Sequence, residues 1–367
     1  MTTIERLRVH RVTIPLLRSF VTAVRGTDGV DALLVEAIDS DGRSGWGEAP
    51  TSWRVTGESP ASVRAAVLGP LSEVVAGRRV SDLDVLGNEL ATAVVQNSAA
   101  RSAVDCAVHD LAAQGQLKSL RAFLGGDDRP VLTDMTLSIA PLDDLVRTAL
   151  EHVDSGFTTL KVKVGSRADT ADAVVRIREA VGSAIGLRVD ANQAWTADEA
   201  VRMIRHWEDH GVGLEFVEQP VAARDVDALA AVTQSVATPI LADESVWTTH
   251  DLGQVIDRRA ADLVNIKLAK AGGLTEARRL VAAAAANDIG VIVGCMMESH
   301  VGIAAAEALA ATLGARDAHR AQDLDAGLWM SSSPVNGGID YAGERLLSRA
   351  TAGLGIDGLA AGVSAHD

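Results

Sequence analysis

The chain has 367 residues, of which 47% are hydrophobic and 23% charged, and its formal net charge is −15. At roughly 150 residues per domain this length predicts two domains, or one large barrel with additions. An acidic chain without a long run of Lys or Arg offers little attraction to nucleic acid or to an anionic membrane, so neither is an expected partner. The expected ligand is a small molecule.

The sequence predicts neither a membrane span nor a signal peptide. The longest strongly apolar stretch, 280–297, is interrupted by Asn287 and Asp288, and the first residues alternate like a strand instead of forming a signal peptide. Cys106 and Cys295 lie in apolar contexts, which predicts buried free thiols and not a disulfide. We expect a cytoplasmic location.

Residues 1–125 predict a separate α+β domain. Two or three antiparallel strands are expected over 4–16 and 31–49, and helices follow over 61–75 and 98–114.

From about residue 131 a β-branched strand alternates with a longer helical pattern. Marker residues of successive units are 24 to 29 residues apart, which suits one strand, one helix and two short loops. Seven strands are expected, at 131–139, 159–164, 187–191, 214–219, 239–244, 262–268 and 291–297, with a short eighth at 321–325.

This repeat favours a (β/α)7β modified TIM barrel over 126–325. The rival is a doubly wound open sheet. No Gly-rich phosphate motif follows the first strand, and charged residues recur at the carboxyl ends of the strands, so the barrel is preferred. The tail, 326–367, is rich in Gly and Ser and is expected to pack back on the capping domain as irregular structure.

Lysines mark the ends of two strands. Lys161 and Lys163 are two residues apart and therefore face the same side of their strand, where each cation disfavours protonation of the other. Lys267 ends the sixth strand, and in a ring of eight strands the second and sixth lie opposite each other. A carbon acid held between these lysines could lose a proton to one side and regain it from the other, which inverts the stereocentre.

Three consecutive strands end in carboxylates, Asp190, Glu218 and Asp243. Such a cluster repels itself unless a cation is present, and oxygen ligands without a neighbouring His or Cys favour Mg²⁺ over Zn²⁺. The other interpretation is that each residue caps a helix or pairs with a lysine. Asp323 and Asp325, on the eighth strand, lie opposite the fourth and point the same way.

Taken together, these residues resemble the enolase superfamily, in the branch of muconate-lactonising enzyme, and within it the dipeptide epimerases of the L-Ala-D/L-Glu type. The resemblance covers essentially the whole chain. It is carried by GWGEAP, VTGES, TLKVKVG, LRVDANQAW, VEQPV, ADESV, NIKLAKAGG and NGGI, in this order and spacing.

The resemblance implies a capping domain over the barrel and Mg²⁺ bound by the three carboxylates. It implies that Lys163 and Lys267 are the two acid/base catalysts, and that Lys161 assists electrostatically. Enolase-superfamily sites in general pair a Lys or His base with Mg²⁺ and an enediolate. It also implies a homo-oligomer.

The implied substrate is a dipeptide whose carboxylate lies at the metal and whose amine lies at Asp323 and Asp325. Thr136 and Met297 are expected to line the pocket. Arg25 matches an arginine that recognises the acidic side chain in alanyl-glutamate epimerases, and Arg54 could assist it.

Three functions stay open at this point. The first is epimerisation of the C-terminal residue of a dipeptide by two-base 1,1-proton transfer. The second is a related activity of the same branch: an N-acylamino acid racemase, an o-succinylbenzoate synthase or a muconate cycloisomerase, whose substrates have no free amine. The third is a metal-stabilised barrel that only binds a ligand.

Overall fold

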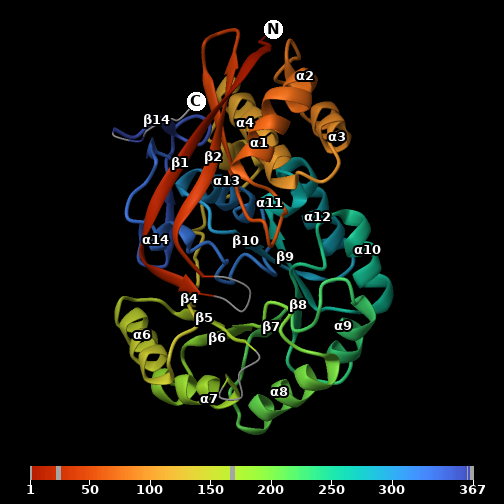
Figure 1. Cartoon of the computed structure of the whole chain (residues 1–367), viewed down its shortest axis with the longest axis vertical. Coiled ribbons are helices and arrows are strands. Elements are labelled where there is room, and N and C mark those ends of the chain that lie inside the picture. The colour runs from red at the N-terminus through yellow and green to blue at the C-terminus, as the bar shows by residue number, and fades with distance from the viewer. Residues whose placement is uncertain (1, 22–25, 166–169, 362, 364–367) are drawn as a thin grey trace.

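The computed structural model describes residues 2–21, 26–165, 170–361 and 363, and combines a parallel barrel with a sheet-and-helix cap (Figure 1). The cap sheet is antiparallel, in the order β1 (Ile4–Val21), β2 (Gly26–Asp39), β3 (Ser44–Pro50). Buried and exposed residues alternate along the first half of β1, as expected for a strand with one covered face. The predicted strands of the first domain are confirmed.

Helical segments complete the cap, and the longest of them packs on β2 and β3. These segments are α1 (Pro60–Ala66), the π-helical turn η1 (Val67–Leu71), α2 (Ser72–Val75), α3 (Leu83–Ala93), α4 (Ser98–Gly115) and α5 (Leu120–Leu124). The central helix, α4, approaches β3 so closely that a Cβ at Gly47 would lie 2.0 Å from the carbonyl oxygen of Ala103. This approach requires glycine at position 47. The glycines of the GWGEAP motif therefore serve helix-sheet packing.

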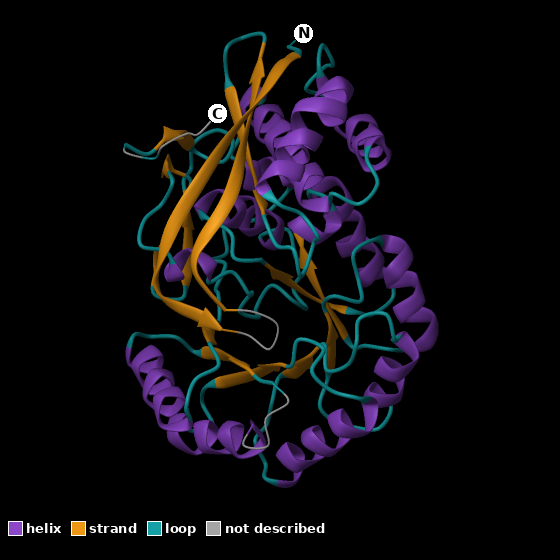
Figure 2. Ribbon diagram, in the orientation of Figure 1, coloured by secondary structure: helices purple, strands orange, loops and turns teal. Residues whose placement is uncertain are grey.

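The barrel sheet holds seven parallel strands in sequence order. They are β4 (Met135–Leu137), β5 (Thr159–Lys163), β6 (Gly186–Asp190), β7 (Phe216–Glu218), β8 (Ile240–Ala242), β9 (Leu263–Lys267) and β10 (Gly290–Gly294). Helices alternate with them along the outside of the barrel, as Figure 2 shows: α6 (Leu142–Asp154), α7 (Thr170–Val181), α8 (Ala197–Asp209), α9 (Val226–Thr233), α10 (Thr249–Arg258), α12 (Leu274–Ala286) and α13 (His300–Ala310). The short α11 (Leu268–Ala271) directly follows β9.

The eighth segment closes the barrel through isolated bridges instead of a full strand. Asp323 pairs with Gly294 at the end of β10, and Gln322 pairs with Thr133 just before β4, both in parallel. The N–H of Asp323 donates to the carbonyl of Val293 at 3.0 Å. Because this segment joins the two edges of the sheet, the (β/α)7β prediction is confirmed and the open sheet is excluded.

The tail is more regular than expected. It forms α14 (Ala326–Trp329) and two small antiparallel pairs, β11 (Val335–Gly337) with β14 (Ile356–Leu359), and β12 (Ile339–Ala342) with β13 (Arg345–Ser348). Gly337, Gly343 and Gly355 have positive φ and allow tight turns between these short strands. Composition alone had suggested irregular loops here. The tail contacts the cap, where the N–H of Leu354 donates to Asp110 Oδ1 at 2.7 Å. The division at residues 125 and 325 stays a prediction.

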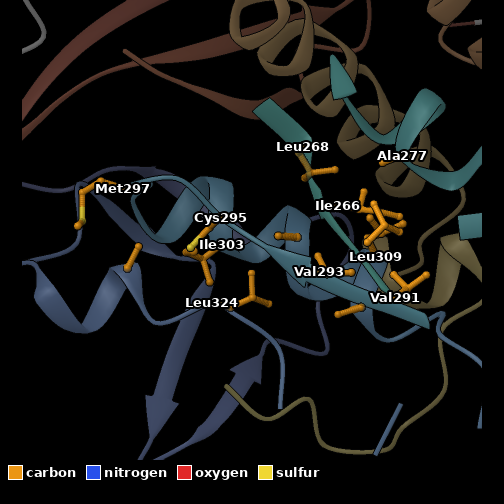
Figure 3. Close-up of a cluster of buried hydrophobic side chains, with 14 of the residues drawn as sticks. Ile266, Leu268, Ala277, Val291, Val293, Cys295, Met297, Ile303, Leu309 and Leu324 are labelled. Atoms are coloured by element: carbon orange, nitrogen blue, oxygen red, sulfur yellow. The ribbon is translucent and has the colours of Figure 1, made fainter. Parts of the chain in front are cut away.

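A continuous apolar core lies between the barrel strands and the helices outside them (Figure 3). Ile266 and Val293, from β9 and β10, pack with Ile303 and Leu309 of α13, and Met297 lies at the edge of this cluster. Both cysteines are buried and free, as predicted. Within the described ranges, no helix is long and apolar enough to cross a bilayer.

Candidate active site

The charged residues chosen from the sequence gather at the carboxyl end of the barrel. Lys163, Asp190, Glu218 and Lys267 are the last residues of β5, β6, β7 and β9, and Asp243 directly follows β8. Parallel strands end at the same edge, which is where barrel enzymes place their chemistry. In the order of the sheet, β5 and β9 are four strands apart, so their lysines face each other across the mouth.

Each carboxylate of the predicted metal triad contacts a lysine. Lys163 Nζ lies 2.5 Å from Asp190 Oδ2, and Lys267 Nζ lies 2.8 Å from Asp243 Oδ2. Lys161 Nζ lies 3.1 Å from Asp190, 2.6 Å from Glu218 and 2.8 Å from Asp323. The arrangement is a compensated cluster of opposite charges.

The pKa values follow from this balance of burial and charge. Burial alone would lower the pKa of Lys161, but Asp323, Glu218 and Asp190 raise it well above the ordinary lysine value. Burial, followed by the neighbouring Asp190, raises the pKa of Glu218 to about 8. The spacing of Lys161 and Lys163 predicts mutual repulsion, which would lower a lysine pKa, but the carboxylates that surround Lys161 reverse this effect.

One pocket opens over this cluster and brings the predicted residues together. Its lining from the barrel and the segments after it comprises Thr136, Lys163, Asn192, Asp243, Glu244, Lys267, Cys295, Met296, Met297, Asp323, Asp325 and Ala326. Phe20 and Val55 line it from the cap. Lys161, Asp190 and Glu218 lie deeper and are fully buried.

The two arginines expected to bind the substrate's acidic side chain are Arg25 and Arg54. Arg25 lies outside the described residues, and its predicted role stays a prediction. Arg54 is exposed, and the residue that lines the pocket from its loop is the neighbouring Val55.

Asp323 and Asp325 face the pocket from the closing segment and are almost fully buried. Asp325 Oδ2 accepts hydrogen bonds from the N–H of Thr136 at 2.8 Å and from Trp329 Nε1 at 3.0 Å. Asp323 Oδ2 accepts from Lys161 and, at 3.3 Å, from Asn265 Nδ2. These contacts hold the two carboxylates side by side at one end of the pocket.

Comparisons with known proteins agree with this architecture over nearly the whole chain. Residues 4–125 match the sequence model of the mandelate racemase / muconate lactonizing enzyme N-terminal domain, and residues 144–359 match the enolase C-terminal domain-like family. The chain belongs to the mandelate racemase / muconate lactonizing enzyme family. The expected membership of the enolase superfamily is confirmed.

Several members of this family are similar at full length. The L-Ala-D/L-Glu epimerase of Bacillus subtilis is 38% identical, with 97% of each chain covered. The L-Ala-D/L-Glu epimerase of Clostridium acetobutylicum is 35% identical, with 97% of this chain and 99% of the relative covered. The hydrophobic dipeptide epimerase of Enterococcus faecalis is 36% identical, with 96% and 99% covered.

Solved structures of family members share the fold closely. A substrate-liganded complex of the B. subtilis L-Ala-D/L-Glu epimerase has a TM-score of 0.94 at 37% identity, covering 98% of this chain and 99% of the other. The E. faecalis dipeptide epimerase, complexed with Mg and the dipeptide L-Leu-L-Tyr, has a TM-score of 0.92 at 35% identity, covering 96% and 99%.

Two polar residues of the site, Lys270 and Asn265, were not predicted from the sequence. Lys270 Nζ is fully buried, lies 2.7 Å from Asp243 Oδ1, and donates to the carbonyls of Val246 and Asn265 at 3.0 and 3.1 Å. Asn265 Nδ2 also donates to Glu218 Oε1 at 3.0 Å. Both residues belong to the NIKLAKAGG motif, and the alternation of the strand would have pointed Asn265 inward beside Lys267.

Two buried oxygens at the mouth have no hydrogen-bond donor within the described ranges. They are Oδ1 of Asn192, in the loop after Asp190, and Oε2 of Glu244, which follows Asp243. Both side chains line the pocket. Unpaired buried oxygens beside carboxylates suit a cation, since they supply oxygen ligands at no cost in broken hydrogen bonds.

A second acidic cluster lies beside the predicted metal triad and is linked to it through Lys161. Asp134, Asp323 and Asp325 each place one carboxylate oxygen within 4.8 Å of the others. Within the described residues, the carboxylates of the predicted metal triad are not drawn together in this way, and each of them contacts a lysine.

Proposed function

We propose that this chain is a Mg²⁺-dependent dipeptide epimerase, an isomerase that inverts the α-carbon of the C-terminal residue. The observation that carries the proposal is the pair of lysines, Lys163 and Lys267, on opposite strands of one pocket that Asp323 and Asp325 also line. The full-length similarity to dipeptide epimerases supports the same reaction.

Asp190, Glu218 and Asp243 are the proposed ligands of Mg²⁺. They lie on consecutive strands, supply only oxygen atoms, and adjoin the unpaired oxygens of Asn192 and Glu244. When bound, Mg²⁺ would supply positive charge to the substrate carboxylate, which gains charge as the α-proton leaves.

Lys163 and Lys267 act in our proposal as the two acid/base catalysts. One takes the α-proton from its face of the substrate, and the other delivers a proton to the opposite face of the resulting enediolate, which inverts the configuration. Each lysine must leave its carboxylate partner for this step. Lys161, fully buried among three carboxylates, stays charged and steadies the substrate carboxylate.

Asp323 and Asp325 bind the free ammonium of the N-terminal residue. Lys161 and Asn265 hold the first carboxylate, and Thr136 and Trp329 hold the second, so both are fixed before substrate arrives. Thr136 and Met297 line the same pocket as these aspartates and the two lysines.

The proposed substrate is L-Ala-D/L-Glu, with Arg25 reading the acidic side chain. Relatives of nearly equal similarity carry different preferences: L-Ala-D/L-Glu at 38% identity, hydrophobic dipeptides at 36% and L-Lys-D/L-Arg at 35%. The residue preference therefore has to be measured.

Chromatographic separation of diastereomers tests the function. The chain, incubated with Mg²⁺ and L-Ala-L-Glu, should accumulate L-Ala-D-Glu, and a panel of hydrophobic and basic dipeptides should react more slowly. If an N-acylated or N-succinyl amino acid is turned over and no dipeptide reacts, the chain belongs with the racemase and lyase activities instead.

We further propose that the enzyme works in the cytoplasm as a homo-oligomer. The free thiols Cys106 and Cys295 suit a reducing compartment. Light scattering of the purified chain tests the oligomeric state, and a monomeric mass at micromolar concentration would contradict it.

A further inference from the structure

Asp134 lies beside the proposed ammonium site without belonging to the lining of the pocket. It sits just before β4, in the stretch that pairs with the closing segment, and its N–H donates to the carbonyl of Gln322 at 2.8 Å. Asp323 and Asp325 follow shortly after the residue with which Asp134 pairs. One oxygen of each of the three carboxylates lies within 4.8 Å of the others.

The three carboxylates have fewer cations than they have charges. Arg188 Nη1 contacts Asp134 Oδ2 at 2.9 Å, and the same guanidinium also contacts Glu215 at 2.7 Å. Lys161 contacts Asp323 but is shared with two carboxylates of the proposed metal triad. Burial, followed by the neighbouring Asp323, accordingly raises the pKa of Asp134 well above the ordinary carboxyl value, and a cation bound beside these groups would favour the charged form of Asp134.

Asp134 Oδ1 gives a second indication that a cation binds here. The residue is 0% exposed, and within the described part of the chain no donor reaches this oxygen. A residue that only anchored Arg188 would need no more than Oδ2. A buried acceptor without a donor is costly, and so are three carboxylates at this separation, unless a cation joins them.

We propose that Asp134 is a positioning residue for the ammonium site, whose charge makes Asp323 and Asp325 select substrates that carry a positive group. This inference rests on the proposed function and adds to it a third carboxylate beneath the two that touch substrate. It assigns Asp134 an effect on binding of the ammonium and none on proton transfer.

The Asp134→Asn variant tests the proposal, because the amide keeps the shape of the side chain and an oxygen for Arg188. We expect the KM for L-Ala-L-Glu to rise about tenfold or more, with kcat changing much less, since one neighbouring negative charge is lost. The Ki of N-propionyl-L-glutamate, which has the same shape without the ammonium, should stay within about twofold of the wild-type value.

Asp317→Asn is the matched control. Asp317 is also buried and ion-paired, with Arg320 at 3.6 Å, but it lies against Gly290 at the start of β10, the opposite end of that strand from the pocket. The KM of Asp317→Asn for L-Ala-L-Glu should not change.

An unchanged KM in Asp134→Asn, or equally weakened binding of the dipeptide and the propionyl analogue, would overturn the proposal. A wild-type chain that epimerises no dipeptide would instead overturn the proposed function, and the ammonium site with it.

Discussion

Lys163 and Asp190 are register partners on adjacent parallel strands, and their charged atoms lie 2.5 Å apart. A proposed catalyst therefore forms an ion pair with a proposed metal ligand. The same holds for Lys267 and Asp243, at 2.8 Å. Proton transfer in the proposed mechanism requires each lysine to give up this contact, and a cation held by Asp190 and Asp243 would favour that change because it repels the ammonium groups.

Metal removal should therefore abolish activity without unfolding the chain. Every carboxylate of the triad has a lysine partner, so these three carboxylates stay paired without the metal and need not disrupt the barrel. We expect EDTA to eliminate epimerisation, added Mg²⁺ to restore it, and far-UV circular dichroism to stay unchanged. Loss of the circular dichroism signal on chelation would show that the ion pairs do not substitute for the metal.

Replacement of each lysine should block α-proton exchange from a different configuration of the substrate. Lys163→Ala should abolish α-proton exchange from one configuration of the C-terminal residue, and Lys267→Ala from the other, each by a factor of roughly a hundred to ten thousand. Exchange into deuterated water, measured separately for L-Ala-L-Glu and L-Ala-D-Glu, checks this. Equal residual exchange of both isomers in either variant would rule out the two-base assignment.

Glu48 should be essential to the junction of cap and barrel. This buried carboxylate of β3 accepts from the N–H and hydroxyl of Ser299, the N-cap of α13, and from the N–H of Gly302 at 3.0 Å. Glu48→Ala leaves these donors unpaired, so unfolding in urea should show a loss of about 3 kcal/mol or more. Glu5→Ala, at an exposed site, is the control and should change stability by less than about 0.5 kcal/mol. A loss in Glu48→Ala no larger than the control's would contradict the assigned role.

Asp110 should make stability depend on pH. Burial raises the pKa of this carboxyl to about 6, although it accepts from the N–H groups of Trp46 and Leu354. Because the folded pKa exceeds the unfolded one, the contribution is full below about pH 4 and is lost as pH rises through about 6.

The Asp110→Asn variant isolates this effect. The amide cannot accept from both N–H groups, so the variant should be less stable throughout, but the difference from wild type should shrink between about pH 4 and pH 6. Unfolding free energies measured across that range check the slope. A difference that is constant with pH, or that grows, would contradict the raised pKa.

The fold could be predicted largely because its signals are local. Each barrel strand is a short β-branched run before a helix, and the rule that parallel strands end at one edge was enough to gather Lys163, Asp190, Glu218 and Lys267. The eighth strand was harder to predict, because in the described part of the chain it is reduced to two isolated bridges, at Gln322 and Asp323. The tail was misjudged because its glycines mark tight turns between short strands, and composition alone does not separate these from loops.

The contacts that were missed join residues far apart in the chain. Glu48 and Ser299 are 251 residues apart, and Lys161 and Asp323 are 162 apart, so no pattern in a local window reveals either pair. Periodicity placed Lys161 on the inner face, but it could not show that three carboxylates would converge on that lysine and reverse the expected direction of its pKa shift.

Proton NMR in D₂O tests the central claim most directly. With the chain, Mg²⁺ and L-Ala-L-Glu, the glutamate α-proton signal should disappear while the L-Ala-D-Glu diastereomer forms, because the proton delivered to the opposite face comes from a lysine in exchange with solvent. Formation of the diastereomer with the original α-proton retained, or absence of exchange from every dipeptide tested, would contradict the account.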